Sequence, residues 1–200
     1  MGSASESCLT VCVAARERAL DALSTPNTTV AERSQLLTKF VIYGTDQTHS
    51  LGAKAALVLG IRFRALPTTA SDDWGLRGET LRAALEEDEA AGVIPFILLA
   101  TFGTTSSGAS ESLAQCSRSI TNTLTADNLL EITAVKKDYP NLFVHLDAAW
   151  SGVFLALPEC RGDVLKALNG GGIDSFCTNV RFLQLLLLVF LSCNCSLSYH

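Results

Sequence analysis

The sequence predicts an α/β fold with a mainly parallel sheet. Short apolar runs, typical of buried strands, alternate along the chain with amphipathic segments typical of helices. Small polar groups or a carboxylate stand where several of these runs end. Because parallel strands end at the same edge of a sheet, we expect these groups to share one ligand-binding edge.

Apolar runs and helical spacing locate the expected elements. Four strands are expected, at 39–43, 61–66, 93–102 and 142–147. Helices are expected at 8–23, 31–38, 51–59, 80–91 and 128–137, with a further one around Lys166. We expect the helix at 80–91 to end at Gly92 and to hold its acidic side chains on a solvated face.

The segment 142–152 carries the most informative residue. Its apolar run ends at one carboxylate, Asp147, which small residues follow. An unpaired carboxylate inside a sheet is costly, so Asp147 needs a donor or cationic partner. Two interpretations remain open: Asp147 binds a ligand at the strand end, or it caps the next turn or pairs with a structural arginine.

Three more segments are expected near this carboxylate. Segment 46–50 joins a strand to a helix and carries His49, which faces a cleft or is a helix-terminal residue bonded to solvent or backbone. Segment 103–108 places Thr104 after another strand. Residues 2–5 precede a helix, where unpaired N–H groups suit a phosphate, although Gly-Ser-Ala-Ser also forms a simple N-cap.

Composition narrows the class of protein. The chain is 48% hydrophobic and 18% charged, with a net charge of −5, which suits a globular core and argues against nucleic acid as a partner. Its seven cysteines form no C-x-x-C pair, which favours a reducing, cytoplasmic location and no metal site. The apolar run 182–191 is shorter than the ~20 residues that a membrane crossing requires, so no membrane partner is expected.

Six short segments of the sequence, in the same order and at similar spacing, resemble those of a known enzyme family. The chain resembles the pyridoxal-phosphate-dependent group II decarboxylases, the aromatic-L-amino-acid and glutamate decarboxylase type. The resemblance implies the large domain of the type I, aspartate-aminotransferase-like fold, with helices on both faces of the sheet. The matching segments are Gly2–Glu6, Asp46–Ser50, Gly92–Phe96, Thr101–Thr105, His145–Trp150 and Asp174–Asn179.

The resemblance also implies roles for individual residues. Asp147 would pair with the protonated ring nitrogen of pyridoxal 5'-phosphate, and at ~3 Å and a dielectric of ~20 that pairing is worth roughly 5 kcal/mol before desolvation. His49 would stack on one face of the ring. The remaining implied contacts are Ala149 on the other face, Thr104 near the ring, Ala4 and Ser5 at the phosphate, and Asn179 as a further cofactor ligand. The substrate would be an L-amino acid, and the full-length family forms homodimers.

Two segments depart from the family pattern. Residues 110–126 are interpreted as an inserted loop. After Asn179 the family continues with Pro-His-Lys-Trp, whose lysine forms the Schiff base with the cofactor, whereas this chain continues Val180-Arg181-Phe182-Leu183. We therefore expect a partial cofactor-binding domain at 1–179 and a non-family tail at 180–200. Our hypothesis is that both departures are translated introns or the result of a faulty gene model, and that an N-terminal portion and the C-terminal domain are missing.

The expected function is that of a carboxy-lyase fragment, impaired because the Schiff-base lysine is absent. The alternatives are a non-catalytic pseudoenzyme or mis-spliced product, and another type I enzyme such as an aminotransferase. A nucleotide-binding Rossmann domain is disfavoured, because no G-x-G-x-x-G turn follows the first strand.

Overall fold

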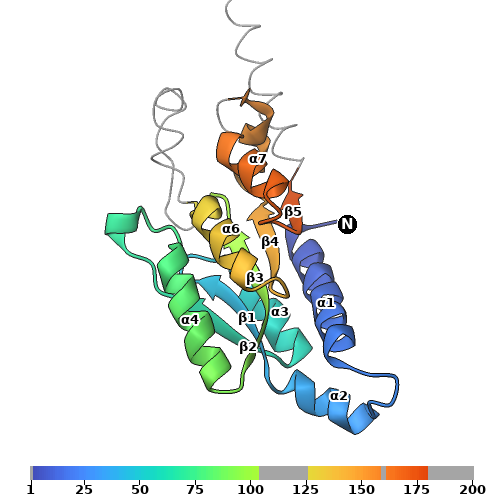
Figure 1. Ribbon diagram of the computed structural model, residues 1–200. Helices are drawn as coiled ribbons and strands as arrows, with labels where there is room; N and C mark the ends of the chain where they lie inside the picture. The colour runs from blue at the N-terminus through green and yellow to red at the C-terminus, as the bar shows by residue number, and fades with distance from the viewer. Residues whose placement is uncertain (1, 104–125, 159–160, 180–200) are drawn as a thin grey trace, which may run out of the picture.

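A five-stranded sheet in which every pairing is parallel forms the centre of the molecule (Figure 1). The computed structural model describes residues 2–103, 126–158 and 161–179. The strand order is β2-β1-β3-β4-β5. The strands are β1 (Phe40–Thr45), β2 (Arg62–Leu66), β3 (Ile94–Thr101), β4 (Phe143–Ala148) and β5 (Ser175–Thr178). The predicted α/β class and parallel sheet are confirmed.

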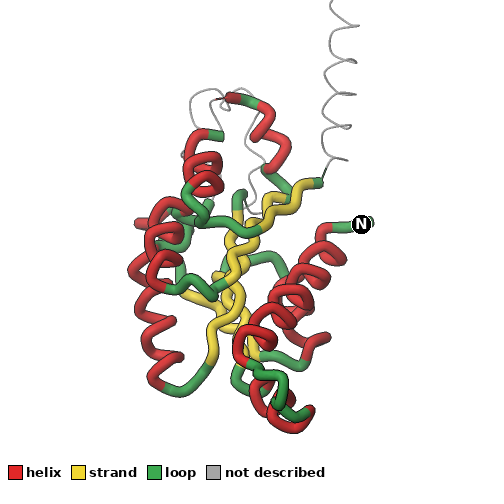
Figure 2. The backbone as a smooth tube through the Cα atoms, turned by 45° about the vertical axis from the view of Figure 1, so that its right-hand side comes forward, coloured by secondary structure: helices red, strands yellow, loops and turns green. Residues whose placement is uncertain are grey.

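Helices cover both faces of this sheet (Figures 1 and 2). One layer comprises α1 (Ala4–Leu23), α2 (Val30–Leu37) and α3 (Leu51–Leu59). The other comprises α4 (Gly78–Ala90), α6 (Leu129–Asp138) and α7 (Gly162–Asn169). Two short 3-10 turns, η1 (Ala70–Asp72) and η2 (Gly152–Ala156), lie in the connections. All the predicted helices are present, and β5 is a strand that apolar periodicity did not predict.

The central strands are buried along most of their length, which explains their continuous apolar sequences. Proline interrupts β3 at Pro95, where a backbone donor is missing. The β1–β3 register shifts at this point, so that Val41 pairs with Pro95 and Ile42 with Ile97. A local irregularity thus accommodates the proline inside a central strand.

One acid of α4 departs from the expected solvated face, on which Glu86, Glu87 and Glu89 are exposed as predicted. Asp88 is not solvated but only 4% exposed, and it accepts hydrogen bonds from the Tyr43 hydroxyl at 2.6 Å and from Arg62 at 2.8 Å. Arg64 forms an ion pair with it at 2.8 Å. Burial raises the Asp88 pKa, but these donors outweigh it and leave the pKa below its usual value. Arg62 and Arg64 are two positions apart on β2, so both project from the same face of the sheet. The helix that covers this face, α4, supplies their common partner Asp88.

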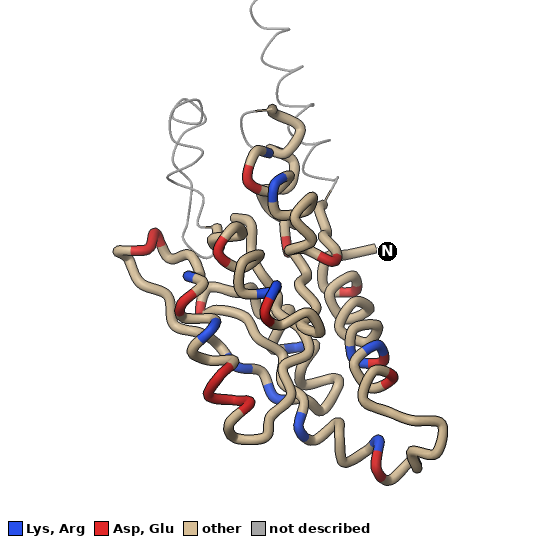
Figure 3. The backbone as a smooth tube through the Cα atoms, in the orientation of Figure 1, with Lys and Arg blue, Asp and Glu red and all other residues tan. Residues whose placement is uncertain are grey.

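Charges of both signs are spread over the helices (Figure 3). In the ranges given above, no helix is long and apolar enough to cross a bilayer, and no group of three or more His, Cys, Asp or Glu residues is placed to hold a metal ion. The predicted tail at 180–200 and nearly all of the predicted loop at 110–126 lie outside the described residues. Ala126 is described and forms an antiparallel bridge with Phe102. The proposed domain boundary after residue 179 stays a prediction.

Candidate functional site

A cavity of about 200 Å³ lies at the carboxyl edge of the sheet. Residues from four separate parts of the chain line it: the start of α1, the β1–α3 connection, the end of β3 and the end of β4. They are Ala4, Ser5, Gln47, His49, Leu51, Thr101, Gly103, Asp147, Ala149 and Trp150. The strand order reverses direction between β1 and β3, and ligands of open α/β sheets bind at such a switch point.

Asp147 stands at the end of β4 and is only 7% exposed. Its Oδ1 accepts hydrogen bonds from the Ala149 N–H at 3.1 Å and from the Cys177 thiol at 3.5 Å. No residue that the structure describes donates a hydrogen bond to Oδ2, and no ion pair among those residues includes Asp147. The structural-arginine interpretation therefore finds no support there, whereas the turn cap at Ala149 is present and leaves one carboxylate oxygen for a ligand.

His49 reaches the cavity from a tight turn after β1. The Thr48 hydroxyl accepts a hydrogen bond from the Thr45 N–H at 2.7 Å, and the Thr48 N–H donates to the Thr45 carbonyl at 3.1 Å. His49 Nδ1 accepts from the Leu51 N–H at 3.2 Å, so the imidazole caps α3 and is held in orientation. Both interpretations of His49 apply together: its side chain bonds to the backbone and also lines the cavity.

The first turn of α1 forms another wall. The Ser3 hydroxyl caps the helix by accepting from the Glu6 N–H at 3.2 Å. The N–H groups of Ala4 and Ser5 have no acceptor within the helix, and they lie at its positive end. Ser3 is thus the cap, while the two following residues line the cavity and can bind an anion.

The end of β3 supplies a crowded wall. Gly103 has φ +78°, and a Cβ placed there would lie 1.7 Å from the Ser151 Oγ. The hydroxyls of Thr101 and Ser151 are buried, and neither has a hydrogen-bond partner within the structure as described. A buried hydroxyl without a partner is unusual, and because Thr101 also lines the cavity, its hydroxyl can form a hydrogen bond with a polar ligand atom.

Asp127 holds the same end of β3 through hydrogen bonds to the backbone. Its carboxylate accepts from the Thr101 N–H at 2.7 Å and from the Leu76 N–H at 2.8 Å. Burial raises the Asp127 pKa to about 6, although both hydrogen bonds act in the opposite direction. Asp127 thus joins β3 to the chain before α4 and holds the Thr101 backbone in place.

The structure brings together most of the residues predicted from sequence. Ala4, Ser5, His49, Asp147 and Ala149 all line the one cavity. Thr104 lies outside the described residues. Asn179 follows β5 and is half-buried, but it is not among the residues that line the cavity, so its role stays a prediction.

Sequence reasoning missed five lining residues: Gln47, Leu51, Thr101, Gly103 and Trp150. Each lies within three residues of a predicted one, and four of them belong to segments already singled out by their family resemblance. The signal that could have found them was their closeness in sequence to the predicted site residues at the ends of the strands.

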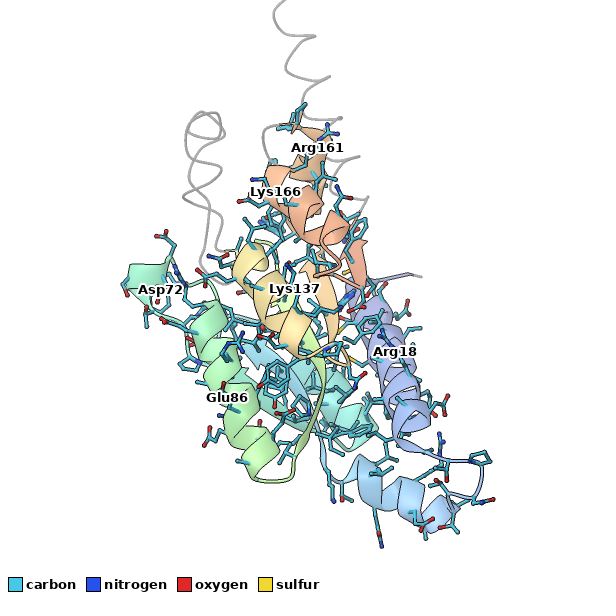
Figure 4. The ribbon with its side chains drawn as sticks, viewed as in Figure 1. Arg18, Asp72, Glu86, Lys137, Arg161 and Lys166 are labelled. Atoms are coloured by element: carbon cyan, nitrogen blue, oxygen red, sulfur yellow. The ribbon has the colours of Figure 1, made fainter. Side chains whose placement is uncertain are left out.

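No lysine lines this cavity, although all five lysines of the sequence are within the described residues. Lys137 and Lys166 come from α6 and α7, in the layer opposite α1 (Figure 4). Lys136 forms an ion pair with Asp174, and Lys166 pairs with Asp163 at 3.0 Å. The cavity thus offers a carboxylate, an imidazole and helix N–H groups, but no side-chain amine.

These features define a class of protein: an α/β domain whose sheet edge suits a small ligand with an anionic group and a hydrogen-bond donor. Comparison with known proteins makes the assignment specific. Residues 1–197 match the family model described as the pyridoxal-dependent decarboxylase conserved domain. The chain belongs to the pyridoxal-phosphate-dependent group II decarboxylase family, whose cofactor is pyridoxal 5'-phosphate.

Similar sequences include enzymes with two kinds of name. The chain is 36% identical over 185 residues to 3,4-dihydroxyphenylacetaldehyde synthase 2 of Drosophila simulans, covering 92% of this chain and 49% of that protein. It is 36% identical over 160 residues to the aromatic-L-amino-acid decarboxylase of Mus musculus, covering 80% and 29%. The chain therefore spans half or less of the length of these relatives.

Solved structures support the type I fold. Tryptophan decarboxylase of Catharanthus roseus, in complex with L-tryptophan, superposes with a TM-score of 0.69 at 31% identity, over 89% of this chain and 33% of that one. The Oryza sativa TDC with PLP and tryptamine gives a TM-score of 0.69 at 29% identity, with the same coverage.

Proposed function

We propose that this chain is the cofactor-binding part of an L-amino-acid decarboxylase and binds pyridoxal 5'-phosphate in the cavity at the sheet edge. The observation that carries the proposal is Asp147, a carboxylate 7% exposed at a strand end, with Oδ1 hydrogen-bonded by the protein and Oδ2 without a described donor. Such an oxygen needs a donor, and a protonated ring nitrogen supplies one.

The residues present fit this cofactor. The unpaired N–H groups at the start of α1 suit its phosphate, and they stand in the same cavity as Asp147. The orphaned hydroxyl of Thr101, the register partner of Asp147 on β3, provides a further polar group in the same cavity. One ligand with a phosphate at one end and a basic nitrogen at the other would pair with both the α1 N–H groups and Asp147.

In the proposed arrangement, each wall has one task. Asp147 holds the proton on the ring nitrogen, and His49 stacks on one face of the ring, with its orientation fixed by the Leu51 N–H. Ala149 is small enough to leave room at the other face, and Trp150 at the rim restricts water. The bound cofactor supplies an electron-accepting ring that delocalises the electron pair released as carbon dioxide departs. A fixed negative charge at Asp147 favours that ring in its protonated, most electron-accepting form.

A second candidate function is non-catalytic cofactor binding, which the absence of a lysine from the cavity favours. Recognition of phosphate and ring nitrogen does not require an amine, whereas covalent catalysis in this family does. The two candidates share the same binding site and differ only in turnover. Homodimerisation, as in the full-length family, is part of the catalytic proposal.

The test is cofactor titration of the purified 200-residue chain and of Asp147→Asn, followed by absorbance. We expect binding by the unchanged chain and an affinity roughly 10- to 150-fold lower in the variant, since a hydrogen bond to a charged group contributes about 1.5–3 kcal/mol. Equal affinities, or no binding by either chain, would refute the proposal. A thermal melt of both proteins controls for loss of fold.

Turnover is measured on the same preparations. L-tryptophan, L-tyrosine and L-DOPA are the first substrates, with release of carbon dioxide, amine and aldehyde recorded, because the relatives carry both decarboxylase and aldehyde-synthase names. Carbon dioxide release supports the decarboxylase. Cofactor binding without release supports the non-catalytic function.

A further inference from the structure

The thiol of Cys177 contacts Asp147, and α1 brings two further thiols to the core under the same face of the sheet. Cys177 of β5 is the register partner of Asp147 in the β4–β5 pairing, so the two side chains project from neighbouring positions on the same side of the sheet. The Cys177 Sγ lies 3.5 Å from Asp147 Oδ1. Cys8 and Cys12 of α1, which are 1% and 0% exposed, belong to the core that packs under this face.

The contact makes the two oxygens of the Asp147 carboxylate different in their hydrogen bonding. Oδ1 accepts both hydrogen bonds, from the thiol and from the Ala149 N–H, while Oδ2 receives none from the described part of the chain. Two donors on one oxygen fix the plane of the carboxylate. We propose that Cys177 is a positioning residue for the cofactor: its thiol orients Asp147 so that Oδ2 meets the ring nitrogen. This inference rests on the proposed function.

A thiol suits this task better than a cationic donor. Burial and then the neighbouring Asp147 charge raise the pKa of Cys177 to about 12, so that Sγ keeps its proton and remains a donor at neutral pH. A hydrogen bond to Cys12, burial and the Asp147 charge raise the Cys8 pKa as well. His145, on the same face of β4, has a pKa lowered by burial and stays largely neutral.

The consequence is a carboxylate held by neutral groups. An arginine in place of Cys177 would orient Asp147 equally well but would neutralise its charge and weaken its hold on a protonated ring nitrogen. Cys177 orients the carboxylate and leaves its negative charge for the ligand.

The experiment compares two ligands on three proteins. The ligands are pyridoxal 5'-phosphate and its 1-deaza analogue, in which carbon replaces the ring nitrogen. The proteins are the unchanged chain, Cys177→Val, which removes the donor and is apolar and somewhat larger, and Cys177→Ser, which keeps a donor. We expect Cys177→Val to weaken binding of the natural cofactor about two- to tenfold, as for the loss of one modest hydrogen bond, and to leave binding of the analogue nearly unchanged. Cys177→Ser restores the preference for the natural cofactor.

Each alternative outcome has its own meaning. Equal weakening of both ligands in Cys177→Val would show a packing role and overturn the inference, as would an unchanged preference for the natural cofactor. If the unchanged chain binds neither ligand, or binds both equally, the proposed function fails and the inference fails with it. Thermal melts of all three proteins establish that they are folded at the assay temperature.

Discussion

Replacement of Asp127 by asparagine should remove the part of the pH dependence of the free energy of unfolding that comes from this carboxyl group. The Asp127 pKa is raised from 3.8 to about 6 in the folded chain, chiefly by burial. The folded state therefore keeps a proton that the unfolded state has lost between these pH values. Its contribution to stability is fully present below pH ~4 and is lost as the pH rises through ~6. At 1.36 kcal/mol per pKa unit, the loss is about 3 kcal/mol.

The assay is urea unfolding of the unchanged chain and of Asp127→Asn between pH 4 and pH 8, followed by far-UV circular dichroism. Asparagine stays neutral, so the free energy of unfolding of the variant should gain about 3 kcal/mol relative to the unchanged chain over this range. A constant offset from the altered hydrogen bonds to the Thr101 and Leu76 N–H groups does not affect the slope. A pH-independent difference between the two proteins would refute the reasoning.

Asp88 provides a matched control of opposite sign. Its pKa is lowered in the fold, so its ionised form stabilises the protein above its unfolded pKa and the contribution is lost on acidification. The disadvantage of Asp88→Asn relative to the unchanged chain should therefore grow as the pH rises toward about 4 and stay nearly constant from there to pH 8, so its urea unfolding is also followed below pH 4. A common slope for both variants would point to a general effect of charge and not to the two individual sites.

Three further predictions concern the walls of the cavity. Ser3→Ala should lower the free energy of unfolding by about 1 kcal/mol in urea titrations, because the Glu6 N–H loses its cap, whereas Ser3→Thr should keep most of it. Gly103→Ala should cost about 2–4 kcal/mol, from its φ of +78° and the collision with Ser151, and Ser151→Gly in the same chain should recover the collision part on thermal melts. Borohydride reduction after cofactor addition should label lysines to the same extent in the unchanged chain and in Asp147→Asn, because no lysine lines the cavity, and peptide mass mapping measures this.

The parts of the fold that sequence could predict are those with strong local signals. The run before Asp147 and the run at 93–102 are continuous and apolar, and both are buried central strands. Gly92 ends α4 with φ +71°, as its position after the helical spacing predicts. Local patterns of this kind do not depend on distant contacts, so they survive in a single sequence.

The parts that escaped prediction depend on contacts between distant segments. Asp88 has the helical position of a surface acid, and only Tyr43, Arg62 and Arg64 from two strands make it a buried one. Strand β5 is short and partly exposed, with Phe176 51% exposed, so no apolar run marks it. Its place in the sheet comes from pairing with β4.

For the site, the sequence could identify the segments that contribute to it but not the role of each residue within a segment. Segment 2–5 left open a phosphate site or a cap, and the structure separates the two: Ser3 caps α1, while Ala4 and Ser5 line the cavity. His49 likewise combines a backbone contact with a place in the cavity. In both cases groups suited to the two alternative roles are present together, on adjacent residues in segment 2–5 and within one residue at His49. Only the three-dimensional structure shows which atom suits which role.

The proposed function separates recognition of the cofactor from its covalent attachment. The groups that suit the ring nitrogen and the phosphate come from β4 and α1, which pack against each other and hold those groups on one rigid edge. An attacking amine is a separate component, and none of the five lysines stands at this edge. In the proposed function, cofactor affinity rests on non-covalent contacts such as those of Asp147 and the α1 N–H groups, so substitutions there should change binding directly, without a covalent link that would mask a weakened contact.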